Sequence, residues 1–141
     1  MHHNKHESKS FINLGVVLND KGEVLMIRRR VLEKGTAGSV LQWAFPGGTQ
    51  WTNETRQESV KRNILSETGY DIQWGRQIDL AFHPEIPVFI VYHLCSLASS
   101  DPIAKPKEAH EIAEIKWVKS EDIKQLITTA LNPKVANELG I

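Results

Sequence analysis

The sequence predicts an α+β fold with an α/β/α layered arrangement, and two kinds of pattern support this. Residues 11–30 contain two runs of β-forming residues, separated by a turn that ends at Gly22, which is the pattern of a β-hairpin. Residues 55–68 instead place apolar side chains at helical spacing. Residues 87–97 are almost continuously apolar, as in a central strand covered by helices on both faces.

The second run of the hairpin ends in consecutive arginines that cannot all face the same way. Side chains alternate along a strand, so Leu25, Ile27 and Arg29 share one face, while Arg28 and Arg30 lie on the other. An arginine on the more buried face needs an anionic partner. We therefore expect at least one of these arginines to form an ion pair inside the protein.

The segment after the hairpin is the first candidate for a functional site. Residues 31–42 have little patterning and predict a loop, and a short strand at residues 43–45 leads into Pro46-Gly47-Gly48. A glycine turn exposes its own backbone, so it can place a carbonyl oxygen on a metal ion or an amide on a phosphate. It serves purely structural turns as well, and both interpretations stay open here.

The predicted helix at residues 55–68 ends before Gly69, which suits the left-handed residue that often follows a helix. Glu67 lies in its last turn, where a carboxylate opposes the helix macrodipole by roughly 0.3–1 kcal/mol. A bound cation or Arg62 would compensate, and a solvated glutamate is the alternative. We expect Glu54 and Arg62 to form a structural ion pair that ties the preceding loop to the helix.

The remaining sequence predicts further strands and two helices. They are strands at residues 70–82, 87–97 and 110–118, a surface loop at 98–108, a helix with Ser120 as its N-cap, and a helix from Asn132-Pro133 to near Gly140.

Composition and charge argue against several classes of protein. The 17 basic and 17 acidic residues balance, which argues against general nucleic-acid binding and against binding to anionic membranes. No apolar run is long enough to predict a membrane span or a signal peptide. Cys95, the single cysteine, lies in an apolar run, so we expect a buried thiol in a reducing compartment and hence a cytoplasmic protein. The length suits one domain at residues 11–141, after a disordered leader at residues 1–10.

Residues 48–70 resemble the signature of the Nudix (MutT-like) family, GX5EX7REUXEEXGU, where U is a bulky apolar residue. The residues that fall in register with it are Gly48, Glu54, Arg62, Ile64, Glu67, Gly69 and Tyr70. The resemblance implies the Nudix fold, an α/β/α sandwich with a mixed β-sheet, and thus a single Nudix domain at residues 11–141. It also implies that Gly48, Glu54, Arg62 and Gly69 are structural residues of this motif.

This Nudix box is degenerate, because Asn63 and Ser66 stand where the family pattern has glutamates. In the family, the glutamates at these places and at Glu67 bind Mg²⁺ or Mn²⁺ ions that bridge a diphosphate. For this chain the resemblance implies a single Mg²⁺ or Mn²⁺ ion, held by Glu67, the Gly47 carbonyl and Glu111.

The choice of Glu111 depends on the strand predicted at residues 110–118. Glu111 lies six residues before Trp117, where the resemblance places a further metal ligand. In a regular strand it would share a face with Ala113 and Ile115. The alternative is that three carboxylates of this region are surface charges, namely Glu108, Glu111 and Glu114.

The resemblance implies a function, and the degenerate box adds an alternative. The first reading is a divalent-cation-dependent hydrolase that cleaves the pyrophosphate bond of a nucleoside diphosphate linked to another moiety. Glu67 and Glu111 would be its catalytic residues, and Arg29 would bind substrate phosphate. The alternative is a nucleotide-binding module that keeps the fold with impaired turnover. The expected partner is a nucleotide-type small molecule in both cases, and a homodimer is expected from the family.

Overall fold

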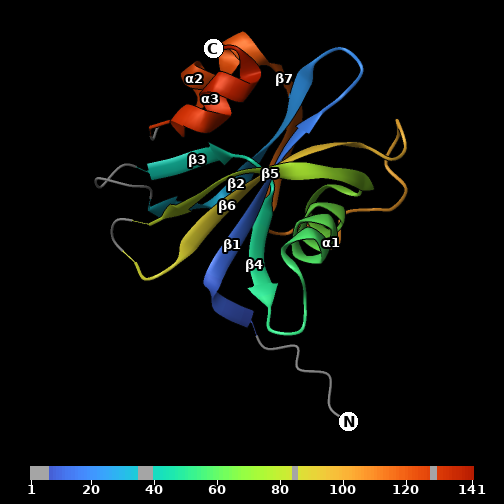
Figure 1. Cartoon of the computed structure of the whole chain (residues 1–141). Coiled ribbons are helices and arrows are strands. Elements are labelled where there is room, and N and C mark those ends of the chain that lie inside the picture. Colours follow the sequence, from blue (N-terminus) through green and yellow to red (C-terminus); the bar gives the residue numbers. More distant parts are fainter. Residues whose placement is uncertain (1–6, 35–39, 84–85, 128–129) are drawn as a thin grey trace.

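The structure is a computed structural model that describes residues 7–34, 40–83, 86–127 and 130–141 (Figure 1). Its strands are β1 (Glu7–Leu18), β2 (Glu23–Lys34), β3 (Val40–Ala44), β4 (Gly47–Trp51), β5 (Ile72–Phe82), β6 (Phe89–Leu97) and β7 (Ile112–Lys119). Its helices are α1 (Arg56–Thr68), the 3-10 turn η2 (Ser120–Asp122), α2 (Ile123–Leu126) and α3 (Pro133–Leu139).

The strands form one mixed sheet, which confirms the expected fold class. The main path through the sheet runs β3-β2-β1-β6-β5, while β4 pairs with β1 and β7 pairs with β2. Strands β1 and β6 are parallel, and the other described pairings are antiparallel. The nearly continuous apolar run at residues 87–97 contains β6, which lies between β1 and β5 as a central strand should.

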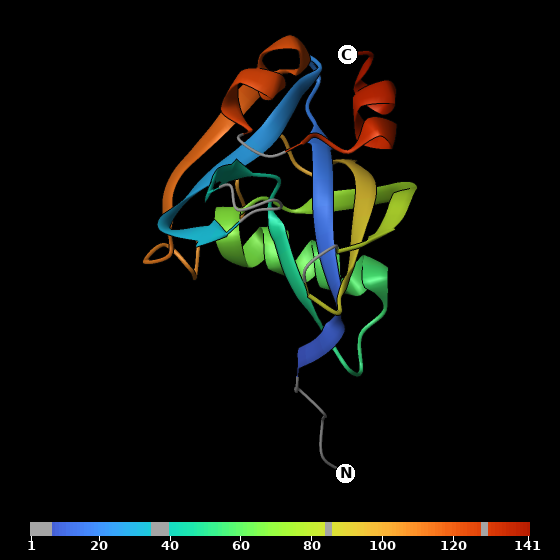
Figure 2. The same cartoon turned by 90° about the vertical axis from the view of Figure 1, so that its left-hand side faces the viewer.

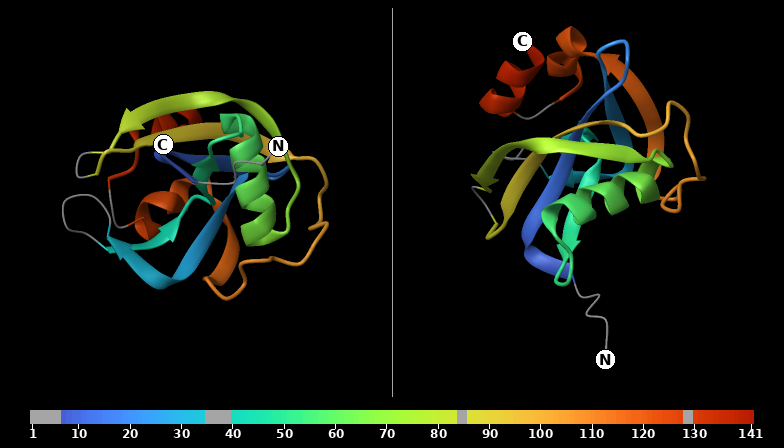
Figure 3. Two further views of the ribbon diagram at one scale, coloured as in Figure 1. Left: turned by 90° about the horizontal axis from the view of Figure 1, so that it is seen from below. Right: turned by 45° about the vertical axis from the view of Figure 1, so that its right-hand side comes forward.

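Side chains of the central strands alternate between two hydrophobic cores, one on each face of the sheet. Val16 and Met26 pack with apolar residues of α2 and α3, whereas Val17 and Leu25 pack with those of α1. All four side chains are fully buried, and burying such a side chain contributes about 1.5–3 kcal/mol. Figure 3 shows α1 and the two C-terminal helices on different sides of the sheet, which makes the α/β/α sandwich.

The first two strands pair next to their hairpin turn and then diverge. Their described register places Leu18 opposite Val24, and further along β1 pairs with β4, with Leu14 opposite Gly47. Figure 2 shows β4 between the diverging β1 and β2. Gly47 has φ 147°, and a Cβ there would lie 2.0 Å from the carbonyl oxygen of Asn13, so the close approach of β4 to β1 requires glycine.

Helix α1 begins and ends where the sequence predicts. Thr55 is its N-cap and forms a capping box with Glu58, in which each side chain accepts a hydrogen bond from the backbone N–H of the other residue. Gly69 closes the helix with φ 81°, and a Cβ there would lie 2.1 Å from the carbonyl oxygen of Ala104, in the loop between β6 and β7.

The first three strands are longer than the sequence predicts. Residues 7–10, expected in the leader, form the start of β1, where their backbone pairs with the end of β4. Residues 31–34 and 40–42, expected in a loop, belong to β2 and β3, because these strands pair beyond the arginines. Residues 1–6 and 35–39 lie outside the described residues.

The helix predicted from Ser120 is shorter than expected, whereas the last helix is confirmed. The helix near Ser120 consists of η2 and the four-residue α2. It ends at Leu126, before three consecutive β-branched residues that disfavour a helix. The N-cap is Lys119 rather than Ser120, and no side chain caps it. Asn132 caps α3 through its side-chain oxygen, and Gly140 ends that helix with φ 71°.

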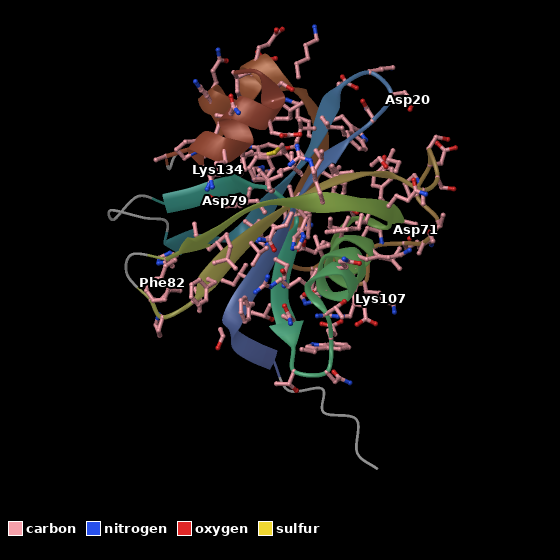
Figure 4. All side chains as sticks on the ribbon, viewed as in Figure 1. Asp20, Asp71, Asp79, Phe82, Lys107 and Lys134 are labelled. Carbon is pink, nitrogen blue, oxygen red and sulfur yellow. The ribbon has the colours of Figure 1, made fainter. Side chains whose placement is uncertain are left out.

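Polar contacts at Asp79 hold α3 against β5. The Asn132 side chain donates to Asp79 Oδ2 over 2.9 Å, and Lys134 Nζ lies 3.4 Å from Asp79 Oδ1 (Figure 4). The hydrogen bond from Asn132 is the largest of the effects that together lower the pKa of Asp79. These contacts also position the residues just before α3, where Leu131 and Asn132 line a cavity.

Cys95 is a buried core residue, as the sequence predicts. It is 3% exposed in the core under α1, and burial raises the pKa of its thiol to about 12, so a reactive thiolate is excluded at neutral pH. Among the described residues, none of the helices has the length and apolar character needed to cross a membrane.

Candidate active site

A cavity of about 670 Å³ lies next to β4 and α1 and has chemically different ends. Its arginine and glutamate side chains come from β2, α1 and the loop before β7, namely Arg29, Arg62, Glu67, Glu108 and Glu111. Asn63, His83 and Asn132 are further polar residues of the lining. Apolar and aromatic side chains line the rest, among them Leu14, Trp43, Phe45, Tyr92, Ile127 and Leu131. These apolar residues pack in the core with α2 and α3, whereas Arg29 pairs with Glu67 of α1.

Glu67 is a buried carboxylate with both oxygens engaged. It is 3% exposed, its Oε1 accepts a hydrogen bond from the Gly47 N–H at 2.7 Å, and its Oε2 lies 2.9 Å from Arg29 Nη1. Burial raises its pKa from 4.5 to about 7, because the lowering by Arg29 and by the Gly47 N–H is smaller than the effect of desolvation. The carboxylate of Glu108 raises this pKa a little further.

Arg29 is a buried arginine, as expected for at least one of the arginines at residues 28–30, and its partner is Glu67. It lies on β2 on the same face as Leu25, toward α1. Its Nη2 also donates weakly to the Gly47 carbonyl, at 3.4 Å. The guanidinium therefore bridges Glu67 and Gly47 and compensates the carboxylate at the end of the helix, so Arg62 does not have this role.

The expected ion pair between Glu54 and Arg62 is present. Arg62 Nε lies 2.6 Å from Glu54 Oε2, and Arg62 Nη2 donates to Glu54 Oε1 at 3.0 Å and to the Thr49 carbonyl at 3.1 Å. The Trp51 N–H donates to the same carboxylate, and the Trp51 ring stacks on the guanidinium at 3.6 Å from its Cζ. These contacts tie the start of α1 and its preceding loop to β4.

Asn63 and Ser66 both make contacts that hold neighbouring segments against α1. The buried amide of Asn63 donates to the carbonyl oxygens of Ser59, at 2.9 Å, and of Thr49, at 3.2 Å, and thereby links α1 to β4. The carbonyl of Ser66 accepts from the Glu108 N–H and so anchors the loop before β7. Gly48 lies on β4 directly against Asn63, where a Cβ would lie 2.7 Å from the Asn63 side-chain oxygen.

Glu111 lines the cavity, but the prediction that it lies on one face of a regular strand is wrong. β7 begins at Ile112, and its register with β2 shifts between Arg28, opposite Glu114, and Arg29, opposite Ile112. A bulge of this kind breaks the alternation of side chains, so counting from Trp117 does not give the face of Glu111. The Glu111 side chain is 56% exposed in the turn before the strand.

The other two carboxylates of this region have different environments. Glu108 is half-buried, lines the cavity and affects the pKa of Glu67, which makes it a second candidate ligand that the sequence pattern did not favour. Glu114 pairs with Arg28 on the surface, at 3.4 Å, and is a surface charge as the alternative interpretation expected. The loop anchored on α1 brings Glu108 to the site, and no motif marks such a residue.

The chain is similar in sequence and in fold to known proteins. The family model described as NUDIX domain matches residues 12–138. A Bacillus subtilis (strain 168) protein named "Putative 8-oxo-dGTP diphosphatase" is 27% identical over 103 residues, which are 73% of this chain and 62% of that protein. The chain thus spans less than two thirds of that relative.

Two solved structures show the same fold. The MutT protein from Methanosarcina mazei Go1 superposes with a TM-score of 0.64 at 22% identity, and the match covers 93% of this chain and 90% of the MutT chain. A NUDIX hydrolase from Nitrosomonas europaea superposes with a TM-score of 0.72 at 16% identity, and the match covers 96% of this chain and 72% of the hydrolase chain. Because the family model matches most of the sequence, the chain belongs to the Nudix family.

Proposed function

We propose that this Nudix protein is a divalent-cation-dependent hydrolase that cleaves the pyrophosphate bond of a nucleoside diphosphate linked to another moiety. The observation that carries the proposal is the arrangement at the polar end of the cavity, where Arg29 contacts both the Glu67 carboxylate and the Gly47 carbonyl. A phosphate-binding cation and two oxygen donors for a metal ion thus lie together beside a cavity large enough for a nucleotide.

The residues at this end fit one hard divalent cation rather than a cluster. Glu67, the Gly47 carbonyl and either Glu108 or Glu111 would hold it, and such oxygen ligands suit Mg²⁺ or Mn²⁺. Within the described residues, no group of three His, Cys, Asp or Glu side chains could hold a metal by itself, so the Gly47 carbonyl and water have to complete the site. A bound ion would polarise the phosphorus centre and lower the pKa of the attacking water.

Glu67 is also suited to accept a proton from water. A general base works best when its pKa is near the working pH, and with no metal ion bound, burial brings the pKa of Glu67 to about 7. Glu111, at the mouth of the cavity, is the other proposed catalytic carboxylate. Arg29 would bind the phosphate, because a guanidinium fork matches two phosphate oxygens.

The two ends of the cavity support a nucleotide-type substrate. Phosphates would lie near Arg29, and the base would lie among the aromatic side chains of Trp43, Phe45 and Tyr92 at the other end.

We further propose that the protein acts in the cytoplasm and forms a homodimer. Light scattering of the purified protein measures the oligomeric state directly.

A nucleotide-binding module with impaired turnover is the second candidate, and one observation favours it. The amide of Asn63 is used to hold β4, so the position does not offer an anionic metal ligand. Losing single groups around a metal typically costs tens- to hundreds-fold in affinity or activity. Two lost carboxylates could therefore abolish turnover and leave nucleotide binding intact.

A substrate screen separates the two candidates. Purified protein is incubated with Mg²⁺ or Mn²⁺ and with nucleoside triphosphates, 8-oxo-dGTP, dinucleoside polyphosphates, ADP-ribose or NADH, and product release is followed. The hydrolase predicts turnover that Glu67→Gln abolishes and that the matched surface variant Glu114→Gln retains. Nucleotide binding without turnover in any of these reactions would contradict the hydrolase and support the binding module.

A gain-of-function variant provides an independent check. Asn63→Glu combined with Ser66→Glu restores the carboxylates of the family pattern. If the parent binds nucleotides without turnover and this variant hydrolyses them, the scaffold and the nucleotide pocket are intact and the metal ligands were the missing part.

A further inference from the structure

Arg29 contacts both oxygen atoms that we propose as ligands of the metal ion, those of Glu67 and Gly47. Its Nη1 lies 2.9 Å from Glu67 Oε2, and its Nη2 lies 3.4 Å from the Gly47 carbonyl oxygen. These are the two inner oxygen atoms of the proposed ion site. The other carboxylate oxygen of Glu67 accepts from the Gly47 N–H at 2.7 Å, so both oxygens of Glu67 already have partners.

A guanidinium and a divalent ion compete for these oxygens. An Mg²⁺ or Mn²⁺ ion needs to approach its oxygen ligands to about 2.0–2.2 Å, and at that distance it would repel a cation that contacts the same atoms. The ion pair is also well shielded from water, since the side chains of Arg29 and Glu67 are 16% and 4% exposed. A metal ion alone therefore has to break a buried ion pair before it binds.

A substrate with a diphosphate removes this obstacle, because it offers Arg29 another anionic partner. Arg29 lines the cavity, and guanidinium groups pair bidentately with phosphate. Among the described cavity-lining residues the other arginine is Arg62, which Glu54 and the Thr49 carbonyl already hold. Arg29 is thus the arginine placed to move from Glu67 to the substrate.

We propose that Arg29 is a resident cation of the ion site, which leaves Glu67 and the Gly47 carbonyl only when a substrate diphosphate binds it. This inference rests on the proposed function of the same site. Its consequence is that metal ion and diphosphate bind with positive coupling, and such coupling is reciprocal by thermodynamic linkage. In the absence of nucleotide, wild-type protein then has a low affinity for Mn²⁺.

The test measures Mn²⁺ binding without any nucleotide, by calorimetry at pH 8, where Glu67 is largely ionised. Arg29→Gln is compared with wild type and with Arg28→Gln, a matched control whose side chain pairs with Glu114 outside the cavity. We expect Arg29→Gln to bind Mn²⁺ at least tenfold more tightly than wild type, and Arg28→Gln to behave as wild type. Adding Glu67→Gln to Arg29→Gln should abolish the gain.

Unchanged or weaker Mn²⁺ binding by folded Arg29→Gln would overturn the proposal. Circular dichroism and thermal unfolding show whether that variant is folded, and Arg29→Lys serves as the second variant. A lysine keeps the charge but has a single ammonium that cannot bridge Glu67 and Gly47 as the fork does, so we expect intermediate Mn²⁺ affinity. If Arg29→Lys binds Mn²⁺ no more tightly than wild type does, the proposal is also contradicted.

The nucleotide screen keeps this inference separate from the function on which it rests. If wild-type protein hydrolyses a nucleotide and Arg29→Gln gains no Mn²⁺ affinity, only the inference about Arg29 fails. If Arg29→Gln gains Mn²⁺ affinity and no nucleotide is hydrolysed, the inference stands and the hydrolase is contradicted.

Discussion

Replacing Glu67 with glutamine should make the protein more stable at pH 8 while it removes the proposed catalytic carboxylate. Glutamine has the shape of a protonated glutamate and stays neutral at all relevant pH values. The wild-type side chain is 3% exposed, and burial raises its pKa from 4.5 to about 7. Folding therefore favours the neutral form of this residue, in spite of the ion pair with Arg29.

The sign and the size of the effect follow from this pKa. Below about pH 4.5 Glu67 is protonated in the folded and the unfolded chain, so its ionisation costs no stability there. As the pH rises from 4.5 toward 7, the unfolded chain releases this proton first and the folded state loses stability. The interval between 4.5 and about 7 corresponds to about 3 kcal/mol, at ~1.4 kcal/mol per pKa unit.

Chemical denaturation at two pH values measures this effect. With a chelator present, Glu67→Gln should exceed wild type by about 3 kcal/mol in its free energy of unfolding at pH 8, and match it near pH 4.5. The surface variant Glu114→Gln should stay within ~0.5 kcal/mol of wild type at both pH values. A Glu67→Gln protein that is less stable than wild type at pH 8 would refute the reasoning, because the ion pair would then outweigh desolvation.

Three further predictions concern the framework of the site. Glu54→Gln should destabilise the protein by about 2 kcal/mol by weakening the charge-assisted contacts with Arg62, and a double-mutant cycle that gives no coupling between these residues in denaturant unfolding would contradict it. Gly47→Ala should lower the free energy of unfolding by about 4 kcal/mol or more, because its Cβ would meet a backbone oxygen at 2.0 Å. Gly22→Ala, in an open turn, should lower it by only about 1 kcal/mol. Similar unfolding midpoints for the two variants would contradict this explanation. Asp79 has a pKa lowered chiefly by its hydrogen bond with the N-cap residue of α3, so it stabilises α3 above its unfolded pKa near 3.8. Amide protection factors in α3, which are corrected for the intrinsic exchange rate, should therefore fall as the pH drops below that value and should not do so in Asp79→Asn.

Local sequence patterns predicted α1 and its contacts well, since these depend on short-range chemistry. Thr55, Gly69 and the pair of Glu54 and Arg62 lie close together along the chain, and the structure places them as the spacing indicates. Alternation along β2 also predicted that at least one of the arginines at residues 28–30 would need a buried anion. It identified neither Arg29 as that arginine nor Glu67 as the anion, because this contact depends on how β2 packs beside α1.

Other features could not be predicted because backbone pairing and a bulge determine them. Strand β4 has the sequence GGTQW, which shows no apolar alternation, and it is a strand because its backbone pairs with β1. The bulge between β2 and β7 changes which way the residues before Ile112 face, so a regular alternation misplaces Glu111. Glu108 reaches the cavity through a loop whose backbone is bonded to Ser66, and single-sequence patterns do not encode such a contact.

The change from a carboxylate to Asn63 has a structural consequence as well as a chemical one. An asparagine amide donates hydrogen bonds, and here it binds the carbonyls of Ser59 and Thr49, which an ionised glutamate could not do. Asn63 therefore fixes β4 against α1 and, through β4, the backbone of Gly47 next to Glu67. The residue that lowers the negative charge of the site is thus also one that holds the remaining carboxylate, the Gly47 carbonyl and the arginine in register. Restoring a glutamate at this position would add a metal ligand and remove two donors from a buried interface. The double substitution should hence gain metal affinity at the expense of stability. A site that keeps one carboxylate of the family motif and holds an arginine against it is best understood as a rearranged Nudix site, not simply as a weakened one.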